Sequence, residues 1–300
     1  MIKKKPYVRK SFLDMVGNTP LVQFKHSKKN KSKIFIKLEG FNPTGSIKDR
    51  TAVSLLKKIK IKNKTIIDSS SGSFACALAY FGFILKKKVE VVCSSKLTKD
   101  KEDFIKHYNA KIRKIGNFTI EGNDYCRKLK KKFPNKYIFL DQLHNKNNPL
   151  IHFQTTAKEI KNQLKTVNAI VISLGSGGTA LGISKYFKNS KTKIVLVESA
   201  SKTKLPGVGS FDDGDYETPF IKEIKLKKLF NYIYKVHINE IKPSYLELKK
   251  QGFFCGPQTA ALLKATKTLI DKKKITGNIV LISGDSGWKN FEDLRNKFND

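Results

Sequence analysis

Short runs of β-branched and aliphatic residues alternate along this chain with stretches of helical periodicity, and this alternation constrains the fold more than any other feature. The runs are almost continuously apolar, as in Ala-Ile-Val-Ile-Ser-Leu at 169–174. Such strands are typical of parallel sheets that helices cover on both faces. Strands are predicted at 33–38, 64–68, 89–93, 111–115, 137–140, 169–174, 193–198, 232–237 and 278–283. Helices are predicted between them at 49–60, 74–85, 103–108, 122–133, 153–164, 178–187 and 258–272.

The number of strands is too large for one compact sheet of ordinary size. A polar, Asn-rich stretch at 142–149 marks a crossing point between two lobes. We therefore expect an α/β protein with two doubly wound domains, each with a central, mostly parallel sheet, and an active site in the cleft between them. The smaller domain is expected at 41–145, and the larger domain at 1–40 and 146–300.

The formal net charge of +35 raises the possibility of a nucleic-acid or membrane-surface partner. Arginine, however, stands at only five positions, and the lysines are scattered over the whole length. A nucleic-acid groove more often gathers arginines and stacking aromatics on one element. We expect a solvated lysine surface with no specific nucleic-acid partner and no membrane association, with anion steering as the alternative.

The cysteines and histidines give no sign of a metal site. The four cysteines have no CxxC spacing, and the five histidines have neither an HExxH arrangement nor any paired ligand spacing. Reduced core thiols and no bound metal are predicted. The first fifteen residues carry charge but no apolar segment of signal-peptide length, so a cytoplasmic protein is expected.

Three small polar loops each follow a predicted strand, at 69–73, 175–179 and 283–287. Open α/β sheets bind ligands beyond the carboxyl ends of their strands, where helix N-termini offer free N–H groups. The Ser-rich first loop suits a carboxylate, and the Gly-rich second loop can approach a phosphate closely. Neither GK[ST] nor GxGxxG is present, which disfavours a nucleotide P-loop and a dinucleotide fold. Each loop alone is more often an ordinary turn, but the three together favour a phosphate-bearing ligand.

A fourth segment, Asn-Pro-Thr-Gly-Ser-Ile-Lys-Asp-Arg at 42–50, delivers Lys48 to the start of a predicted helix. A lysine there opposes the helix dipole unless function requires an amine of lowered pKa. A Schiff-base lysine has this requirement. Position alone does not single out Lys48 among so many lysines.

These residues resemble a known family. Gly-Asn-Thr-Pro-Leu-Val at 17–22, Lys-Leu-Glu at 37–39 and the segment 42–50 are similar to the N-terminal signature of the cysteine synthase and cystathionine β-synthase family. These are pyridoxal-phosphate enzymes of fold type II, which also includes the tryptophan synthase β subunit. The order of the later loops continues the resemblance over nearly the whole chain.

The resemblance implies pyridoxal 5'-phosphate as cofactor and assigns roles to particular residues. Lys48 would hold the cofactor as an internal aldimine and then remove the substrate α-proton. The other implied cofactor contacts are Ser73 at the 3'-oxygen, Gly175, Ser176, Gly177, Gly178 and Thr179 at the phosphate, and Ser286 at the pyridine nitrogen. The implied substrate contacts are Ser70, Ser71, Gly72, Phe74, Gln142 and Gly207. Asp285 neighbours Ser286 and points the other way in an extended strand, so the sequence does not settle which of them faces the ring.

The implied activity is β-elimination or β-replacement on an activated L-serine, O-acetyl- or O-phospho-L-serine, through an aminoacrylate intermediate, as in cysteine synthases. The partners would be a small amino acid, a small nucleophile and a second copy of the chain in a homodimer.

Departures from the family pattern keep alternatives open. Ser73 replaces the usual Asn, and Phe74 replaces a carboxylate-binding Thr. The nucleophile could be an amino acid, giving a 2,3-diaminopropionate precursor, because 205–209 resembles that branch; elimination from cysteine or serine is another alternative. A protein that binds the cofactor without turnover is the non-enzyme alternative. The acidic stretch 212–217 is either a lid that attracts a cationic co-substrate or a solvated loop.

Overall fold

Two sheets of unequal size organise the chain, and most of their strands are parallel. The computed structural model describes residues 8–26, 31–60, 63–70, 72–203, 205–291 and 294–295. The strands are β1 (Leu21–Phe24), β2 (Lys33–Leu38), β3 (Thr65–Ser69), β4 (Val89–Cys93), β5 (Lys111–Lys114), β6 (Tyr137–Phe139), β7 (Ala169–Ser173), β8 (Lys193–Ser199), β9 (Tyr232–Val236) and β10 (Asn278–Ser283).

Helices fill most of the connections between strands. The α-helices are α1 (Lys48–Lys57), α2 (Ser73–Ile84), α3 (Lys99–His107), α4 (Thr119–Lys132), α5 (Asn147–Ile151), α6 (Ala157–Gln163), α7 (Gly178–Phe187), α8 (Pro219–Leu226), α9 (Lys242–Lys250) and α10 (Pro257–Asp271). A π-helical turn, η3 (His152–Thr156), joins α5 to α6. Short 3-10 turns are η1 (Phe12–Met15), η2 (Glu39–Phe41), η4 (Phe211–Asp213), η5 (Ile238–Glu240) and η6 (Gly287–Asn290).

The larger sheet has six strands in the order β1-β2-β10-β7-β8-β9. Only β1 runs antiparallel to its neighbour. Alternate residues of the central strands enter two cores: Val171 and Leu281 pack on the α9 and α10 face, while Ile172 and Ile282 pack on the α6, α7 and α8 face. Burial on both faces explains why these strands read as unbroken apolar runs.

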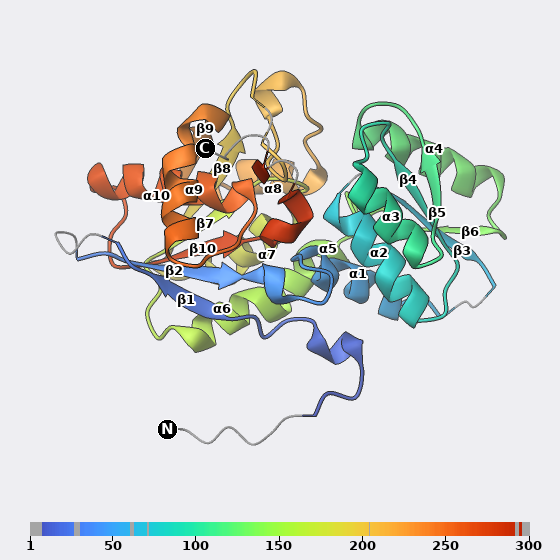
Figure 1. Ribbon diagram of the computed structural model, residues 1–300, viewed down its shortest axis with the longest axis horizontal. Helices are drawn as coiled ribbons and strands as arrows, with labels where there is room; N and C mark the ends of the chain where they lie inside the picture. Colours follow the sequence, from blue (N-terminus) through green and yellow to red (C-terminus); the bar gives the residue numbers. More distant parts are fainter. Residues whose placement is uncertain are drawn as a thin grey trace.

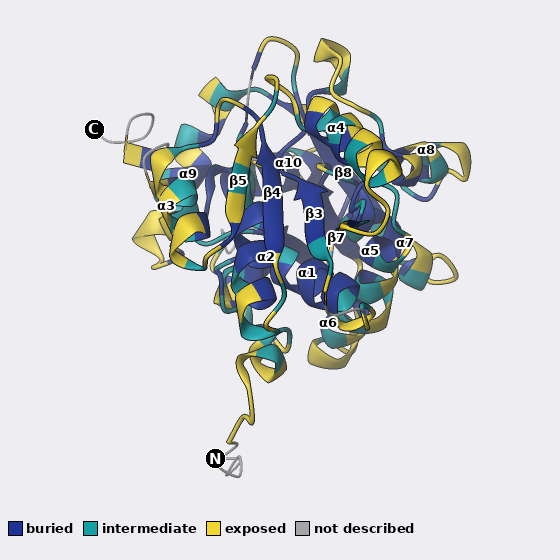
Figure 2. Ribbon diagram, turned by 90° about the vertical axis from the view of Figure 1, so that its right-hand side faces the viewer, coloured by how far each residue is buried: buried dark blue, intermediate teal, exposed yellow. Residues whose placement is uncertain are grey.

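The smaller sheet has four parallel strands in the order β5-β4-β3-β6. Helices α1, α2 and α3 supply the core on one face, and α4 covers the other. The central strands β3 and β4 are dark blue in Figure 2, since almost every residue in them is buried. The fold class predicted from the sequence, an α/β protein with mostly parallel sheets, is confirmed.

Figure 1 shows the two sheets as the centres of two lobes, with α5 between them. All four strands of the smaller sheet lie within 41–145, and the strands of the larger sheet lie outside that range. The segment around η1 departs from the predicted division, because Leu13 and Val16 pack on the core of the smaller lobe and Phe12 contacts Tyr80 edge to face. Apolar side chains at the start of the chain thus cover the smaller lobe.

No helix among the described residues is both long enough and apolar enough to span a bilayer.

Candidate active site

Lys48 is the first residue of α1, and the turn before it is held at the end of β10. The Asp49 carboxylate accepts hydrogen bonds from the N–H of Thr44 (2.7 Å) and from its hydroxyl, which closes the turn. The N–H of Ile47 donates to the carbonyl of Gly284 (2.8 Å). Local hydrogen bonding and pairing with β10 therefore fix the backbone of Lys48 at the carboxyl end of the larger sheet.

Lys48 as a whole is half-buried, and its amine points at the loop that follows β7. Its Nζ lies 3.3 Å from Oγ of Ser176. Burial lowers the pKa of Lys48, and the negative charge of Asp285 acts in the opposite direction. A lysine of lowered pKa has a larger neutral fraction, which can act as a nucleophile or take up a proton.

The loop Gly175–Thr179 joins β7 to the N-terminus of α7, as the sequence predicts. Gly177 has φ of +80°, which favours glycine, and no side chain of the described residues caps the helix there. Gly178 packs so closely against Asn148 that no side chain fits there: a Cβ added at Gly178 would clash with Oδ1 of Asn148. The first N–H groups of α7 have no acceptor within the helix, so this end suits a phosphate.

Asn148 and His152, from the segment between the two lobes, support this loop, and neither was predicted as a site residue. Asn148 Nδ2 donates to the carbonyl of Gln142 (2.9 Å) and lies 3.5 Å from Ser176 Oγ. His152 Nε2 lies 3.3 Å from the Thr179 hydroxyl. Burial lowers the pKa of His152 well below its usual value, so the ring is neutral and orients the hydroxyl without adding charge.

The Ser-rich loop after β3 leads into the N-terminus of α2. Ser70 Oγ accepts from the N–H of Gly72 (3.3 Å), and Ser73 is the first residue of the helix. An added Cβ at Gly72 would meet no atom of the described residues within 4 Å, so this loop faces open space. Ser71 lies outside the described residues. The free N–H groups at this helix start suit a carboxylate.

Phe74, which the resemblance places at the substrate, has its side chain elsewhere. The ring is 1% exposed and packs in the core of the smaller lobe. An apolar ring on the inner face of α2 gains more free energy from burial than from contact with a polar amino acid. Phe74, in place of the family's Thr, therefore removes a hydroxyl from the site without adding a bulky side chain to it.

Gln142 is 3% exposed and lies beside the Ser-rich loop. Its Nε2 donates to the carbonyl of Ser69 (3.1 Å), and its N–H donates to Asp68 Oδ2 (3.1 Å). Its Oε1 is buried and has no hydrogen-bond partner among the described residues. A buried acceptor without a partner is costly, so a ligand N–H or O–H at this position would be stabilised.

Asp285 and Ser286 follow β10 and point to different places. Ser73 donates a hydrogen bond to Asp285 Oδ1 (3.1 Å), and the Asp285 charge acts on Lys48. The resemblance assigns Ser286 to the pyridine nitrogen. In the structure its hydroxyl lies against Gly45: a Cβ added at Gly45 would be 2.8 Å from Oγ of Ser286. The Asp285 charge thus acts on Lys48, while the Ser286 hydroxyl lies against the turn at Gly45.

A buried ion cluster lies beneath α1. Arg50 donates to both carboxylate oxygens of Glu39, at 2.7 and 2.8 Å, and to both of Glu159, at 2.6 and 2.8 Å. Lys37 donates to Glu159 Oε2 (2.7 Å). The Arg50 and Lys37 charges overcome the effect of burial and lower the pKa of Glu159 to about 2. The Lys37, Glu39 and Arg50 motif residues thus hold β2, α1 and α6 together rather than contact a substrate.

The acidic stretch 212–217 is occupied by local partners. Asp212 pairs with Lys235, and Asp213 accepts from Ser201 Oγ (2.7 Å). Tyr216 instead reaches the segment between the two lobes, where its hydroxyl lies 2.8 Å from His144 Nε2. The stretch behaves as a structured loop, and its engaged carboxylates give no support to the hypothesis of a lid for a cationic co-substrate.

Gly207 lies between the glycine-rich loop and Asp285. A Cβ added at Gly207 would be 3.9 Å from Oδ2 of Asp285. The carbonyl oxygen of Gly207 would be 3.5 Å from a Cβ added at Gly175. With φ of +78° the position favours glycine. The structure thus brings Lys48, the glycine-rich loop, Ser73, Gly207 and Asp285 together at one place.

A sequence profile described as "Pyridoxal-phosphate dependent enzyme" (PALP) matches residues 12–285. The chain belongs to this family. The enzyme is 32% identical to a cysteine synthase of Aquifex aeolicus, over 95% of this chain and 92% of the relative. It is 28% identical to cysteine synthase B of Pseudomonas aeruginosa, over 85% of this chain and 89% of the relative. The predicted family, the prediction that this is an enzyme and the predicted cofactor are confirmed.

Solved structures show the same fold. A hydrogen sulfide-producing enzyme from Fusobacterium nucleatum has a TM-score of 0.83 at 27% identity, over 95% of this chain and 99% of that one. O-acetyl serine sulfhydrylase isoform 3 from Entamoeba histolytica has a TM-score of 0.86 at 25% identity, over 100% of this chain and 95% of that one. An O-ureido-L-serine synthase has a TM-score of 0.87 at 20% identity, over 98% of this chain and 97% of that one. At this identity the similarity shows the fold alone.

The residues at the site fit pyridoxal phosphate. The phosphate fits the uncapped start of α7, where Gly178 leaves no room for a side chain. Lys48, with its amine 3.3 Å from this loop, can bond to the aldehyde carbon. Ser73 and Asp285 offer polar groups to the ring.

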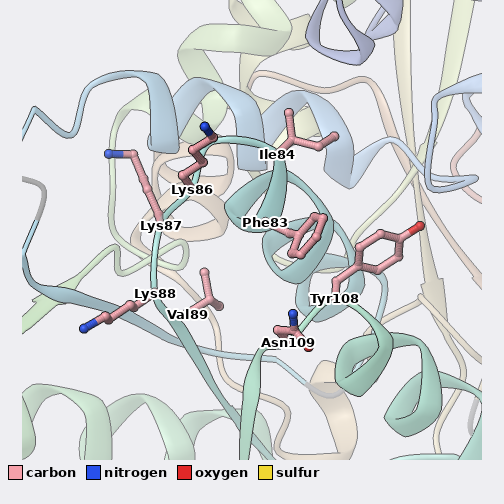
Figure 3. Close-up of a pocket in the computed structure, with 8 residues that line it drawn as sticks. All are labelled: Phe83, Ile84, Lys86, Lys87, Lys88, Val89, Tyr108 and Asn109. Atoms are coloured by element: carbon pink, nitrogen blue, oxygen red, sulfur yellow. The ribbon is translucent and has the colours of Figure 1, made fainter.

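Two hollows of the surface do not include Lys48. One of 520 Å³ lies beside Phe83 and Tyr108. Figure 3 shows the ammonium groups of Lys87 and Lys88 turned away from these rings, and Lys87 donates to the carbonyl of Ile59 (2.9 Å). The hollow therefore lacks the inward charges of an anion site.

Proposed function

We propose that this enzyme catalyses β-replacement on an O-activated L-serine, with O-acetyl- or O-phospho-L-serine as substrate and sulfide as the nucleophile. The observation that carries the proposal is the position of the Lys48 amine, which lies against the glycine-rich loop and has a lowered pKa. The similarity to a cysteine synthase over nearly the full length of both chains supports the same activity.

The Ser-rich loop is proposed to bind the substrate carboxylate. Gly72 faces open space, and Ser70 and the first N–H groups of α2 lie next to it in the loop beside Gln142. The unpartnered Oε1 of Gln142 can accept a hydrogen bond from a group of the substrate. Held at these points, the substrate α-carbon comes within reach of Lys48.

Lys48 is proposed to move the proton. Its neutral amine takes the proton from the substrate α-carbon. When bound at the Lys48 site, the cofactor would supply the electron-withdrawing group that stabilises the charge left on that carbon. The β-substituent then departs with its electron pair, and the nucleophile adds at the β-carbon. The ammonium of Lys48 returns the proton to the α-carbon, so the amine is regenerated.

The test is cysteine formation by the purified holoenzyme from sulfide with O-acetyl-L-serine or O-phospho-L-serine. We expect Lys48→Ala to lose turnover, and we expect Lys57→Ala, at the exposed far end of the same helix, to keep it. Full turnover by Lys48→Ala would overturn the proposal. Sulfide release from L-cysteine without net cysteine synthesis would replace it with elimination.

A further inference from the structure

A hydrogen bond joins the larger lobe to the segment between the two lobes. The hydroxyl of Tyr216 lies 2.8 Å from Nε2 of His144, and the centres of the two rings are 5.9 Å apart. Tyr216 stands in the loop between η4 and α8, which belongs to the larger lobe. The contact thus connects two parts of the chain that are 72 positions apart in the sequence.

Asp141 holds the ring of His144 in one orientation. Oδ1 of Asp141 lies 2.7 Å from Nδ1 of His144. A carboxylate is an acceptor only, so Nδ1 carries the proton, and Nε2 of the uncharged ring is left as an acceptor. The hydroxyl of Tyr216 is therefore the donor in the contact with His144.

The smaller lobe in turn holds Asp141. Two side chains of α4 contact its carboxylate: Asn123 Nδ2 donates to Oδ1 (3.1 Å), and Arg127 Nη2 donates to Oδ2 (3.5 Å). The backbone N–H of His144 also donates to the carbonyl of Asp141 (2.9 Å). Hydrogen bonds therefore run without a break from α4 in the smaller lobe to Tyr216 in the larger lobe.

Each side of the Tyr216 contact lies close in the sequence to a part of the active site. Gln142, beside the Ser-rich loop, comes shortly before His144. Thr218 comes shortly after Tyr216, and its Oγ1 donates to the carbonyl of Ser176 in the glycine-rich loop (2.7 Å). The contact therefore ties the segment at the proposed substrate loop to the loop that fits a phosphate.

Water can reach the Tyr216 contact. Tyr216 is 38% exposed, and the side chain of His144 is 27% exposed. Asn148, which also connects Ser176 with Gln142, is buried. A hydrogen bond that water can replace opens at low cost in free energy. Asn148 thus fixes the two segments on the inside of the protein, while the contact between Tyr216 and His144 can break and form again in the folded enzyme.

We infer that Tyr216 is a positioning residue for the amino-acid substrate: its hydrogen bond to His144 holds Gln142 and the Ser-rich loop against the glycine-rich loop. The inference rests on the proposed function in that an amino acid binds at the Ser-rich loop. Loss of one such hydrogen bond should weaken amino-acid binding about threefold to tenfold. The affinity for the cofactor should not change, because Asn148 still supports the glycine-rich loop.

The test uses Tyr216→Phe, which removes the hydroxyl and keeps the ring. The holoenzyme is titrated with O-acetyl-L-serine and with L-cysteine, and the visible absorption of the cofactor gives the apparent dissociation constants. We expect both constants to rise about threefold to tenfold in Tyr216→Phe and in His144→Ala. His144→Gln should keep most of the affinity, because its amide oxygen can accept the hydrogen bond in place of Nε2. The matched control is Tyr234→Phe, which removes the same hydroxyl from the edge strand β9 and should change neither constant.

Steady-state kinetics separate positioning from a general loss of structure. We expect Tyr216→Phe to raise the KM for the amino acid and to leave kcat unchanged, because the contact acts alike on the bound substrate and the transition state. The double variant Tyr216→Phe/His144→Ala should lose no more affinity than either single variant, since both remove the same hydrogen bond.

Hydrogen–deuterium exchange of the holoenzyme tests the contact without any substrate. We expect faster exchange at 141–146 and 211–218 in Tyr216→Phe than in Tyr234→Phe, and equal exchange in α10. Equal exchange at both segments would overturn the inference, and so would unchanged amino-acid affinities in Tyr216→Phe. An enzyme that forms no cysteine, but in which Tyr216→Phe exchanges faster at both segments and binds amino acids more weakly, would contradict the proposed function and leave this inference standing.

Discussion

The amine nitrogen of Lys48 lies 3.3 Å from Oγ of Ser176, although the two residues are 128 positions apart in the sequence. Asn148, from the short helix between the lobes, lies 3.5 Å from the same hydroxyl. Ser176 therefore joins the amine at the start of α1 to the loop that fits a phosphate. This proximity places the group that can bond to the cofactor aldehyde beside the group that can hold its phosphate.

Replacing Gly178 with alanine is expected to weaken cofactor binding. The added Cβ would meet Oδ1 of Asn148 at 2.2 Å, and the start of α7 would have to move. Overpacking of this kind typically costs about 1–3 kcal/mol. Fluorescence titration of the apoenzyme with pyridoxal phosphate measures the change. The double variant Gly178→Ala/Asn148→Ala removes the opposing atom and should recover part of the affinity, whereas unchanged binding by the single variant would contradict this account of the loop.

Arg50 is expected to be essential for stability. Glu39 is fully buried and Glu159 is mostly so, and Arg50→Ala would leave both with fewer counter-charges. Breaking a buried pair in this way costs about 3–5 kcal/mol. The control is Lys99→Ala, because Lys99 and Asp103 form an exposed pair, and such pairs contribute little to stability. Urea unfolding of both variants gives the comparison, and equal losses would show that the cluster contributes no more than a surface pair.

Asp68 should make the stability depend on pH. Burial raises the pKa of Asp68 to about 8, above the 3.8 of an unperturbed carboxyl. The folded state thus holds a proton that the unfolded chain releases between these values, and the contribution of Asp68 to stability falls as the pH rises through that window. Unfolding free energies from about pH 5 to about pH 9 should show the unaltered enzyme losing stability relative to Asp68→Asn. A constant difference over this range would mean that Asp68 is ionised in the fold.

Most of the fold could be predicted from the sequence, because the buried parallel strands require continuous apolar runs. All nine predicted strands are present. Strand β1 was missed because it is short and lies at the edge of the sheet, where two of its four residues are exposed. Helices α8 and α9, of eight and nine residues, were also missed.

The site could be predicted only where its chemistry is local in the sequence. Lys48 and the glycine-rich loop stand in motifs with their own turn residues. The position of the Ser286 hydroxyl depends on how the end of β10 packs against Gly45, which no local pattern specifies. Asn148 and His152 were missed for a similar reason, because they act through residues about thirty positions away.

The central claim is that Lys48, among the many lysines of this chain, bonds to the cofactor. Reduction of the holoenzyme with sodium borohydride, followed by proteolysis and mass spectrometry, tests it most directly. The account predicts the phosphopyridoxyl group on the peptide that contains Lys48 and no such group in the Lys48→Ala variant. A modification found on another lysine instead would contradict the account.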